Sequence, residues 1–445
     1  MADVKTLPGI RYAASADGAP PDLARLVTPP YDVISPEAQA RYYARDPHNI
    51  IRLELGRDEP GDDELNNRYT RAATAFAEWR LDGVLRQDVP SLYVYQQEFS
   101  SGGQNYTRTS LVARVRLEPW EAGVVLPHER TLSKPKDDRL KLLRACAANL
   151  SPILALYDDP NGSLTAAMGQ STTHGQSPVA ELTDEAGETH RLWAVSDAEF
   201  ARNVLAFFRE RQLYIADGHH RYETALTYRD ETAELRKGLP HDDPANFTLM
   251  ALSAIEDPGL LVLPTHRVLR TLDATRLADL RDALAPYFAV EPLDGADADA
   301  AVAALAGAGR ETIAFVLATR QQTELLRLLP AGRAAMEQLA GAHARASDAW
   351  RRLDVAILHE LVLNAALGIS DEVVRAGEHI SYTRDAGAAL AAVAQGHDGA
   401  EVALLLNATP PAAIRDVARA GDRMPQKSTY FYPKLITGLV INPVW

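Results

Sequence analysis

Leu213-Tyr214-Ile215-Ala216-Asp217-Gly218-His219-His220-Arg221 is the stretch of sequence that decides the fold of this chain. Within it an apolar strand, Leu213 to Ala216, gives way to a helical run that starts near Tyr222. A helix start leaves backbone N–H groups without helical partners and carries the positive end of the helix dipole, so it attracts anions, phosphate above all. The sequence therefore predicts a strand, a tight turn and a helix, with an anion site at the turn.

The side chains of this turn have the chemistry of a phosphate site. Gly218 lets the backbone come close to a ligand, and the planar, permanently charged guanidinium of Arg221 suits phosphate oxygens. His219 and His220 add hydrogen-bond donors or metal ligands, and Asp217 adds a carboxylate. The alternative is a plain turn in which Asp217 caps the helix and the histidines face solvent. Five such residues in a row favour a site.

The overall composition is that of a soluble enzyme. A chain of 445 residues exceeds what one hydrophobic core usually organises, so we expect two or more domains. A net charge of −14 argues against a general affinity for nucleic acid or anionic membranes. Cys146 is the single cysteine, which excludes a disulfide within the chain and favours a reducing compartment. With no signal-like N-terminus and no apolar run of bilayer length, we expect a cytoplasmic protein.

Strands and helices alternate along the chain without the sustained rhythm of a doubly wound sheet, which favours α+β domains. In the first part we expect hairpins at 91–115 and 179–195, strands at 49–55, 151–157, 247–255 and 260–263, and helices at 62–81 and 200–211. In the Ala-rich second part we expect paired strands at 311–318 and 323–329, a long helix at 349–367 and a buried strand at 401–406.

These patterns predict two domains. The first, residues 1–270, is an α+β domain that carries the Asp217 turn, and the second, residues 271–445, is an α/β domain. The aromatic and polar loop 424–434 near the end of the second domain can return to the site. The composition alone sets this boundary.

Other polar segments supply further candidate site residues. Two prolines before Tyr31 fix an extended backbone that aims Asp32, and Ser35 is expected to cap a helix that starts at Pro36. On the predicted strand 49–55, Arg52 and Glu54 project from one face, where they either pair with each other or join a site. Further candidates for substrate or phosphate contact are His128, Lys134, Lys136, Arg139, His266 and Arg267.

Six segments, taken in order, resemble one bacterial family, DUF1015, and the resemblance extends over nearly the whole chain. The segments are Thr28–Ser35, Asn49–Glu54, His128–Thr131, Ile215–Thr224, Leu263–Arg267 and Pro425–Lys434. The residues Gly218 to Arg221 are also similar to the phosphate-binding turn of the ParB and sulfiredoxin superfamily, whose members bind a nucleotide there. Sulfiredoxins have a catalytic cysteine where this chain has His219, so their sulfinic-acid chemistry is not implied.

Within that superfamily, free-serine kinases phosphorylate L-serine and carry a turn like this one. The resemblance implies a ParB/sulfiredoxin-like mixed-sheet core and an ATP-dependent kinase for L-serine or a similar hydroxylated metabolite, with ATP or ADP as donor and Mg²⁺ as the metal. Phosphoryl transfer needs phosphate-binding donors, carboxylates for magnesium and one base. We assign Gly218, His219, His220 and Arg221 to the nucleotide phosphates. The candidates for base or magnesium ligand are Asp217, Glu129 and Asp32, and His219 is a further catalytic candidate.

Two alternatives stay open. A metal-dependent hydrolase would use His128, His219, His220 and His266, but the sequence lacks the usual spacing of metal ligands. A nucleotide-binding regulator would act on a protein partner, because the acidic chain carries no helix-turn-helix pattern for DNA. The sequence leaves the substrate, the catalytic base and the oligomeric state open.

Overall fold

The computed structural model describes residues 1–14, 18–129, 133–173, 177–293, 295–377 and 379–445. Contacts between residues divide the chain into two units. The first unit comprises Met1–Pro127, Thr131–Leu261 and Pro433–Trp445, and the second comprises His128–Arg130 and Val262–Tyr432. The boundary suggested by composition, after residue 270, lies inside the second unit. The first unit is therefore discontinuous in sequence.

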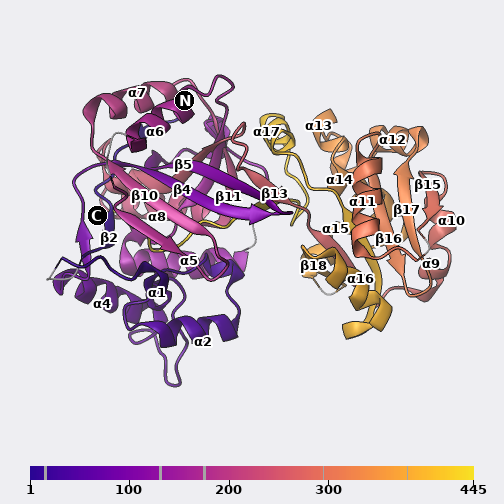
Figure 1. The fold of residues 1–445 in the computed structure, drawn as a ribbon, viewed down its shortest axis with the longest axis horizontal. Coiled ribbons are helices and arrows are strands. Elements are labelled where there is room, and N and C mark those ends of the chain that lie inside the picture. The colour runs from indigo at the N-terminus through magenta and orange to yellow at the C-terminus, as the bar shows by residue number, and fades with distance from the viewer. Residues whose placement is uncertain (15–17, 130–132, 174–176, 294, 378) are drawn as a thin grey trace. The chain divides into compact units, whose positions relative to one another are not determined.

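A mixed sheet organises the first unit. Its strand order is β6-β11-β8-β12-β5-β4-β10-β9, and β1 also pairs with β5. Strand β11 runs parallel to β6, and β12 runs parallel to β8, whereas the other pairs are antiparallel. Figure 1 shows β5, β4 and β10 side by side. The strands are β1 (Val4–Lys5), β4 (Leu92–Ser101), β5 (Gln104–Arg116), β6 (Val125–Pro127), β8 (Ile153–Tyr157), β9 (Ala180–Thr183), β10 (Thr189–Val195), β11 (Leu213–Asp217) and β12 (Phe247–Ala254).

The helices of the first unit and two short strand pairs surround this sheet. One sheet face, with Val94, Leu111, Ile215 and Leu252, forms the apolar core. The helices are α1 (Leu23–Leu26), α2 (Pro36–Arg45), α3 (Ile51–Glu54), α4 (Arg68–Leu81), α5 (Ser133–Cys146), α6 (Ser163–Thr173), α7 (Ala198–Phe208) and α8 (His219–Leu235), with short 3₁₀ turns η1 (Tyr31–Val33), η2 (Trp120–Ala122) and η3 (Pro244–Asn246). The strand pairs are β2 (Ile10–Tyr12) with β3 (Leu85–Gln87), and β7 (Ala148–Asn149) with β21 (Asn442–Pro443).

Both predicted hairpins are present. Strands β4 and β5 pair from Tyr93 with Val112 to Ser101 with Gln104, and the two residues left between them are Gly102 and Gly103. Both glycines have positive φ, as a two-residue hairpin turn demands. Strands β9 and β10 form the second hairpin. The Ser35 cap is also confirmed, because its side chain accepts a hydrogen bond from the Ala38 N–H.

The strand predicted at 49–55 is wrong, because this segment contains the short helix α3 (Ile51–Glu54). The side chain of Asn49 accepts a hydrogen bond from the Ile51 N–H at 2.9 Å and so starts a helical turn. Since residues two apart in a helix face different ways, Arg52 and Glu54 do not share a face. The guanidinium of Arg52 donates to the Tyr43 carbonyl instead.

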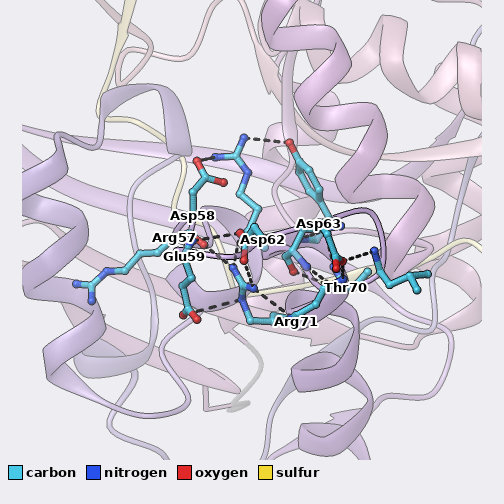
Figure 2. A network of polar contacts seen from close by, with 12 residues as sticks. Arg57, Asp58, Glu59, Asp62, Asp63, Thr70 and Arg71 are labelled. Atoms are coloured by element: carbon cyan, nitrogen blue, oxygen red, sulfur yellow. Dashed lines mark hydrogen bonds and ion pairs between the residues drawn. The ribbon is translucent and has the colours of Figure 1, made fainter.

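Helix α4 starts later than its apolar pattern suggests. Asn67 caps it in a reciprocal arrangement with Thr70, so the helix begins at Arg68, and Leu65 lies outside it with 87% of its surface exposed. Arg71 holds the preceding loop through two bonds to Asp62, of 2.6 and 2.9 Å, and one to the Arg57 carbonyl (Figure 2). This network fixes the start of α4.

The second unit contains a sheet of order β15-β17-β16-β19-β14-β18, and its described pairs are all antiparallel. The strands are β14 (His266–Arg270), β15 (Phe288–Pro292), β16 (Ala314–Thr319), β17 (Thr323–Leu328), β18 (Ile380–Thr383) and β19 (Ala400–Leu406), and β13 (Leu261–Leu263) pairs separately with β20 (Tyr430–Tyr432). Val316, Leu325 and Leu405 belong to its core, and in Figure 1 helix α11 lies against β16 and β17.

The helices of the second unit include one correction. They are α9 (Ala274–Ala278), α10 (Leu280–Leu284), α11 (Ala298–Gly309), α12 (Pro330–Glu337), α13 (Asp348–Arg351), α14 (Asp354–Ile357), α15 (Asp371–Ala376), α16 (Ala386–Gln395) and α17 (Pro411–Arg419), with 3₁₀ turns η4 (Gly341–His343) and η6 (His397–Gly399). The single helix predicted at 349–367 is wrong, because Leu353 is extended between α13 and α14 and a π-helix, η5 (Leu358–Ala366), follows. The chain as a whole is a mixed α and β fold with a mixed sheet, which confirms the predicted class at that level.

Candidate functional site

The turn between β11 and α8 has the predicted form. Strand β11 ends at Asp217, helix α8 begins at His219, and Gly218 between them has a φ of 96°. Such a φ favours glycine, and a Cβ at this position would lie only 2.9 Å from Nε of Arg221. Gly218 is thus needed both for the left-handed backbone and for the guanidinium packed against it.

Asp217 is the centre of an ion-pair group and does not cap the helix. Its Oδ2 lies 2.7 Å from Nη2 of Arg221, and its Oδ1 lies 2.8 Å from Nζ of Lys434. The helix cap is Gly218, which makes no side-chain bond. Burial by itself would raise the pKa of Asp217, but Lys434 and Arg221, together with His219, outweigh it and hold the pKa well below its usual range. Asp217 is therefore a carboxylate at neutral pH.

Arg221 is anchored at two points. Besides Asp217, its Nη1 donates to the Pro152 carbonyl. Burial lowers the pKa of Arg221, but the charges of Asp217 and Asp32 more than compensate and raise it. Asp32 lies in η1 with an exposed side chain, and its charge is one of those that raise the pKa of Arg221.

Lys434 is a site residue that the sequence reasoning did not assign. Two buried polar side chains of the sheet hold its segment: Arg108 donates to the Pro433 carbonyl at 2.7 Å, and Gln97 donates to the Lys434 carbonyl at 3.0 Å. Arg108 also donates to Gln97. Lys434 ends the last of the six resembling segments, directly after a rigid proline, and that position was the available signal.

Arg139 and Glu54 form a second ion pair, and both line a pocket together with Arg221. Nη1 of Arg139 donates to the backbone carbonyl of Glu54 at 2.9 Å and to its Oε1 at 3.3 Å, and Ser151 donates to the same Oε1 at 3.0 Å. Burial raises the pKa of Glu54, although Arg139 and Arg221 oppose this. The Arg139 guanidinium also lies 4.0 Å from the centre of the Tyr31 ring. Glu54 and Arg139 therefore connect the turn to the Tyr31 segment.

Between these groups the first unit contains a small pocket of about 40 Å³, which is partly open to the surface. Glu54, Arg139, Ser151 and Arg221 line it together with Thr224. This volume has room for water and not for a metabolite.

The remaining predicted residues of the first unit lie at the start of α8, next to it, or outside the described side chains. Lys136 forms an ion pair of 2.9 Å with Glu223 of α8. His219 is buried and His220 is half-buried in the first turn of α8. The side chain of Lys134 is outside those that the structure describes, and so is Thr131 of the predicted His128 segment. Hence the first unit brings Asp32, Glu54, Arg139, Asp217 and Arg221 together, and it directs Arg52 elsewhere.

Four predicted residues belong to the second unit. Nε2 of His128 lies 3.1 Å from Oγ1 of Thr429, and Glu129 accepts a hydrogen bond from the Lys427 N–H at 3.4 Å. Arg267 is 1% exposed and donates to the carbonyls of Thr265 and Lys427. Burial lowers the pKa of Arg267 to about 10.

His266 is the fourth of these residues. It is 2% exposed, and its Nδ1 accepts a hydrogen bond from the Leu406 N–H at 3.3 Å. Burial, with a smaller contribution from Arg267, lowers its pKa to about 4. His128, Glu129, His266 and Arg267 therefore pack around strands β14 and β19 and the loop that leads to Lys427, whereas the Asp217 turn belongs to the first unit.

Metal-ligating side chains gather elsewhere. Among the described residues, the group of three with ligand atoms within 4.8 Å of one another is Asp184, Glu188 and His190, at the tip of the β9–β10 hairpin. His219 and His220 lie in the first unit and His128 and His266 in the second, and none of them belongs to this group. Among the described side chains, the four histidines proposed for a metal-dependent hydrolase therefore do not form a metal-binding group.

Comparison with known proteins places the sequence in a family. The model of the family described as Protein of unknown function (DUF1015) matches residues 4–356. The chain belongs to this family. The match includes five of the six segments singled out above, and it ends before the segment with Lys434. No functionally curated protein matches this DUF1015 chain.

Solved structures are similar to it only in part. A conserved hypothetical protein from Pyrococcus furiosus has 12% identity and a TM-score of 0.35, over 76% of this chain and 97% of its own. A free serine kinase in complex with AMP has 11% identity and a TM-score of 0.34, over 72% and 86% of the two chains. SbnI from Staphylococcus aureus, truncated at its C-terminus, has 11% identity and a TM-score of 0.33, over 74% and 87%. No helix in the described parts of the chain has the length and apolar character needed to span a bilayer.

Proposed function

We propose that this DUF1015 protein is an ATP-dependent kinase for a small hydroxylated metabolite such as L-serine, built on a ParB/sulfiredoxin-like core. The observation that carries the proposal is the β11–α8 turn, where a glycine with a φ of 96° leads directly into a helix of 17 residues. The first turn of such a helix presents its N–H groups to an anion. Two cations, Arg221 and Lys434, lie at the same place. These features support a site for nucleotide phosphates.

Each chemical role that phosphoryl transfer requires has a candidate within the first unit. Arg221 and the backbone of His219 and His220 would bind phosphate oxygens. Of the five N–H donors of the Arg221 guanidinium, one goes to Asp217 and one to the Pro152 carbonyl. Asp217, whose pKa is lowered, is a poor proton acceptor and would instead hold the two cations in place. Asp32 is exposed, its charge acts on Arg221, and it is our candidate base. It would take the proton of the substrate hydroxyl as the hydroxyl oxygen bonds to the transferred phosphorus and the phosphoanhydride bond breaks.

Of the two carboxylates in the first unit that were predicted to bind magnesium, Asp32 and Asp217, only Asp32 is suited to do so. Mg²⁺ is usually held by one or two carboxylates together with substrate phosphates, and it neutralises the charge of the transferred group. Asp32 is an exposed carboxylate of that kind, whereas both oxygens of Asp217 already accept from cations. Asp32 is thus a candidate for either role, base or magnesium ligand, and the nucleotide phosphates would supply the other contacts to the metal. Glu129, in the second unit, stays a candidate from the sequence alone.

Phosphorylated product is the decisive test of this function. The purified protein is incubated with Mg²⁺, ATP or ADP and a panel of hydroxylated metabolites that includes L-serine, and the products are identified by mass spectrometry. We expect one phosphorylated metabolite. If ATP binds but nothing is phosphorylated, the kinase is excluded and a nucleotide-binding regulator replaces it.

Replacing Arg221 by Ala tests the phosphate site separately. Loss of one charge-assisted contact should weaken ATP binding, measured by calorimetry, by about 1.5 to 3 kcal/mol. Arg236→Ala is the matched control, because Arg236 lies just after the far end of α8 and pairs with Asp243. Unchanged ATP affinity in a folded Arg221→Ala variant would remove the turn from the proposal.

A further inference from the structure

The second unit contains a cavity that the kinase proposal does not use. Its volume is about 530 Å³, within the range of small-molecule sites. It lies between helices α9 and α10 on one side and the β16–β17 hairpin with the start of β19 on the other. Leu277, Leu280 and Leu317 supply apolar wall, and Arg320, Gln321 and Gln322 supply polar groups from the hairpin turn.

A buried carboxylate, Glu324, also lines this cavity. Glu324 lies on β17 opposite Leu317 of β16, and it is 2% exposed. Its neighbour Leu325 faces the apolar core of the unit, so the alternation of the strand directs Glu324 to the opposite sheet face, the one that α9 and α10 border. A carboxylate in such a place is costly unless it is paired and hydrogen-bonded.

The partners of Glu324 satisfy it only in part. Its Oε1 lies 3.4 Å from Nε of Arg281, a side chain that is 55% exposed. Its Oε2 is buried and has no hydrogen-bond partner within the described part of the chain. The other carboxylate of the cavity, Glu401, is already used, because it accepts the Leu272 N–H at 2.7 Å. Oε2 of Glu324 is therefore an acceptor without a donor, on a side chain that lines a cavity large enough to admit one.

We propose that this cavity binds a small molecule with a protonated amino group on an apolar body. The ammonium group supplies both the positive charge and the N–H donor that Oε2 of Glu324 lacks, while the apolar body lies on Leu277, Leu280 and Leu317. Two kinds of compound share this chemistry, namely simple amines and α-amino acids. The carboxylate of an amino acid would meet Arg281 or Arg320 in the same cavity.

Three compounds of one shape test the charge requirement in the full-length protein. Phenethylamine carries the ammonium group alone, L-phenylalanine adds a carboxylate, and 2-phenylethanol replaces the ammonium group by a hydroxyl. In calorimetric titrations we expect phenethylamine, L-phenylalanine or both to bind at least about tenfold more tightly than the alcohol, the scale of one charge-assisted bond. Tighter binding of L-phenylalanine than of phenethylamine assigns the site to amino acids, and the reverse order assigns it to simple amines. Equal affinity for the amine and the alcohol, or no binding of either ammonium compound, overturns the proposal.

Two variants place that binding at Glu324. Glu324→Gln keeps the size of the side chain and should weaken binding of the ammonium compounds about tenfold or more, while Glu311→Gln, at a carboxylate that is 78% exposed in the same unit, should leave it unchanged. Should Glu324→Gln fail to fold, Ala278→Trp decides, because this exposed position lines the cavity and a bulky side chain there should abolish binding. Wild-type affinity in folded Glu324→Gln, or in Ala278→Trp, contradicts the site.

Discussion

At the scale of single residues, the Asp217 turn is one arrangement of mutually dependent groups. Gly218 leaves room for the Arg221 guanidinium, Arg221 and Lys434 hold Asp217 ionised, and Arg108 positions the segment that carries Lys434. Each of these side chains is held in position by another, so the turn is preorganised before any ligand binds. Preorganised donors are what an anion site requires, because no reorganisation has to accompany binding.

Gly218→Ala tests this dependence. The positive φ should cost about 1 to 2 kcal/mol in unfolding free energy, and the displaced Arg221 should lower ATP affinity as well. The control is Gly187→Ala, where φ is also positive, at 80°, but no atom lies within 4 Å of an added Cβ. Urea unfolding and ATP calorimetry give both quantities. If the contact with Arg221 is the cause, Gly218→Ala and Arg221→Ala combine non-additively, and simple additivity would refute it.

His266 makes the stability of the second unit depend on pH. Its pKa is about 4 in the folded protein and about 6.5 in an unfolded chain, so the unfolded state binds the proton more readily. The contribution of His266 to the free energy of unfolding is therefore complete above about pH 6.5. It is lost as the pH falls towards 4, and the loss amounts to about 3 kcal/mol.

Urea unfolding between pH 7 and pH 4, followed through the second unit by hydrogen exchange, measures this loss. In His266→Gln the pH dependence should be smaller, whereas in His397→Gln, at a side chain that is 72% exposed, it should match the wild type. An identical pH profile in His266→Gln and wild type would show that His266 does not titrate in this range.

At the scale of helices and strands, local signals decided where prediction succeeded. The two hairpins and the β11–α8 turn follow from glycines and polar turn residues next to apolar runs, and these features act within a few residues. The segment 49–55 failed because its β-branched residues and apparent alternation suggested a strand, while one side-chain bond of Asn49 starts a helix. The break at Leu353 in the predicted long helix has no signal such as proline or glycine.

The composition of the site was predictable only in part, for a related reason. Asp217, Gly218 and Arg221 are adjacent in sequence, so their relation could be inferred. Lys434 reaches Asp217 across 217 positions, and no local pattern states that contact. The same holds for Glu54 and Arg139, which are 85 positions apart. Long-range ion pairs are set by the packing of the whole unit.

At the scale of the whole molecule, the first unit depends on a segment that follows the second. Residues 433–445 contribute Lys434, and they bury six aliphatic side chains, Leu435, Ile436, Leu439, Val440, Ile441 and Val444. Each fully buried side chain of this kind stabilises a fold by about 1.5 to 3 kcal/mol. The net stability of a domain is only about 5 to 15 kcal/mol, so the burial of these side chains contributes a free energy comparable with the whole net stability of the unit.

A chain that ends at Tyr432 should therefore lose the fold of the first unit. We expect its protection from hydrogen exchange in β4, β5 and β11 to disappear, while that of β16 and β19 in the second unit remains. A chain that ends at Val444 is the control, because it lacks only Trp445, which is 44% exposed. Retained protection in β11 of the shorter chain would contradict the dependence.

This discontinuity has a consequence for how the chain is made. A ribosome releases residues from the N-terminus onward, so every strand of the large mixed sheet has emerged by Ala254, yet Lys434 and the aliphatic residues after it emerge about 180 positions later. The second unit, whose last residue is Tyr432, is complete first. The Asp217 turn thus acquires its second cation only after the second unit has been synthesised, and a nascent chain stalled earlier lacks the segment that carries Lys434.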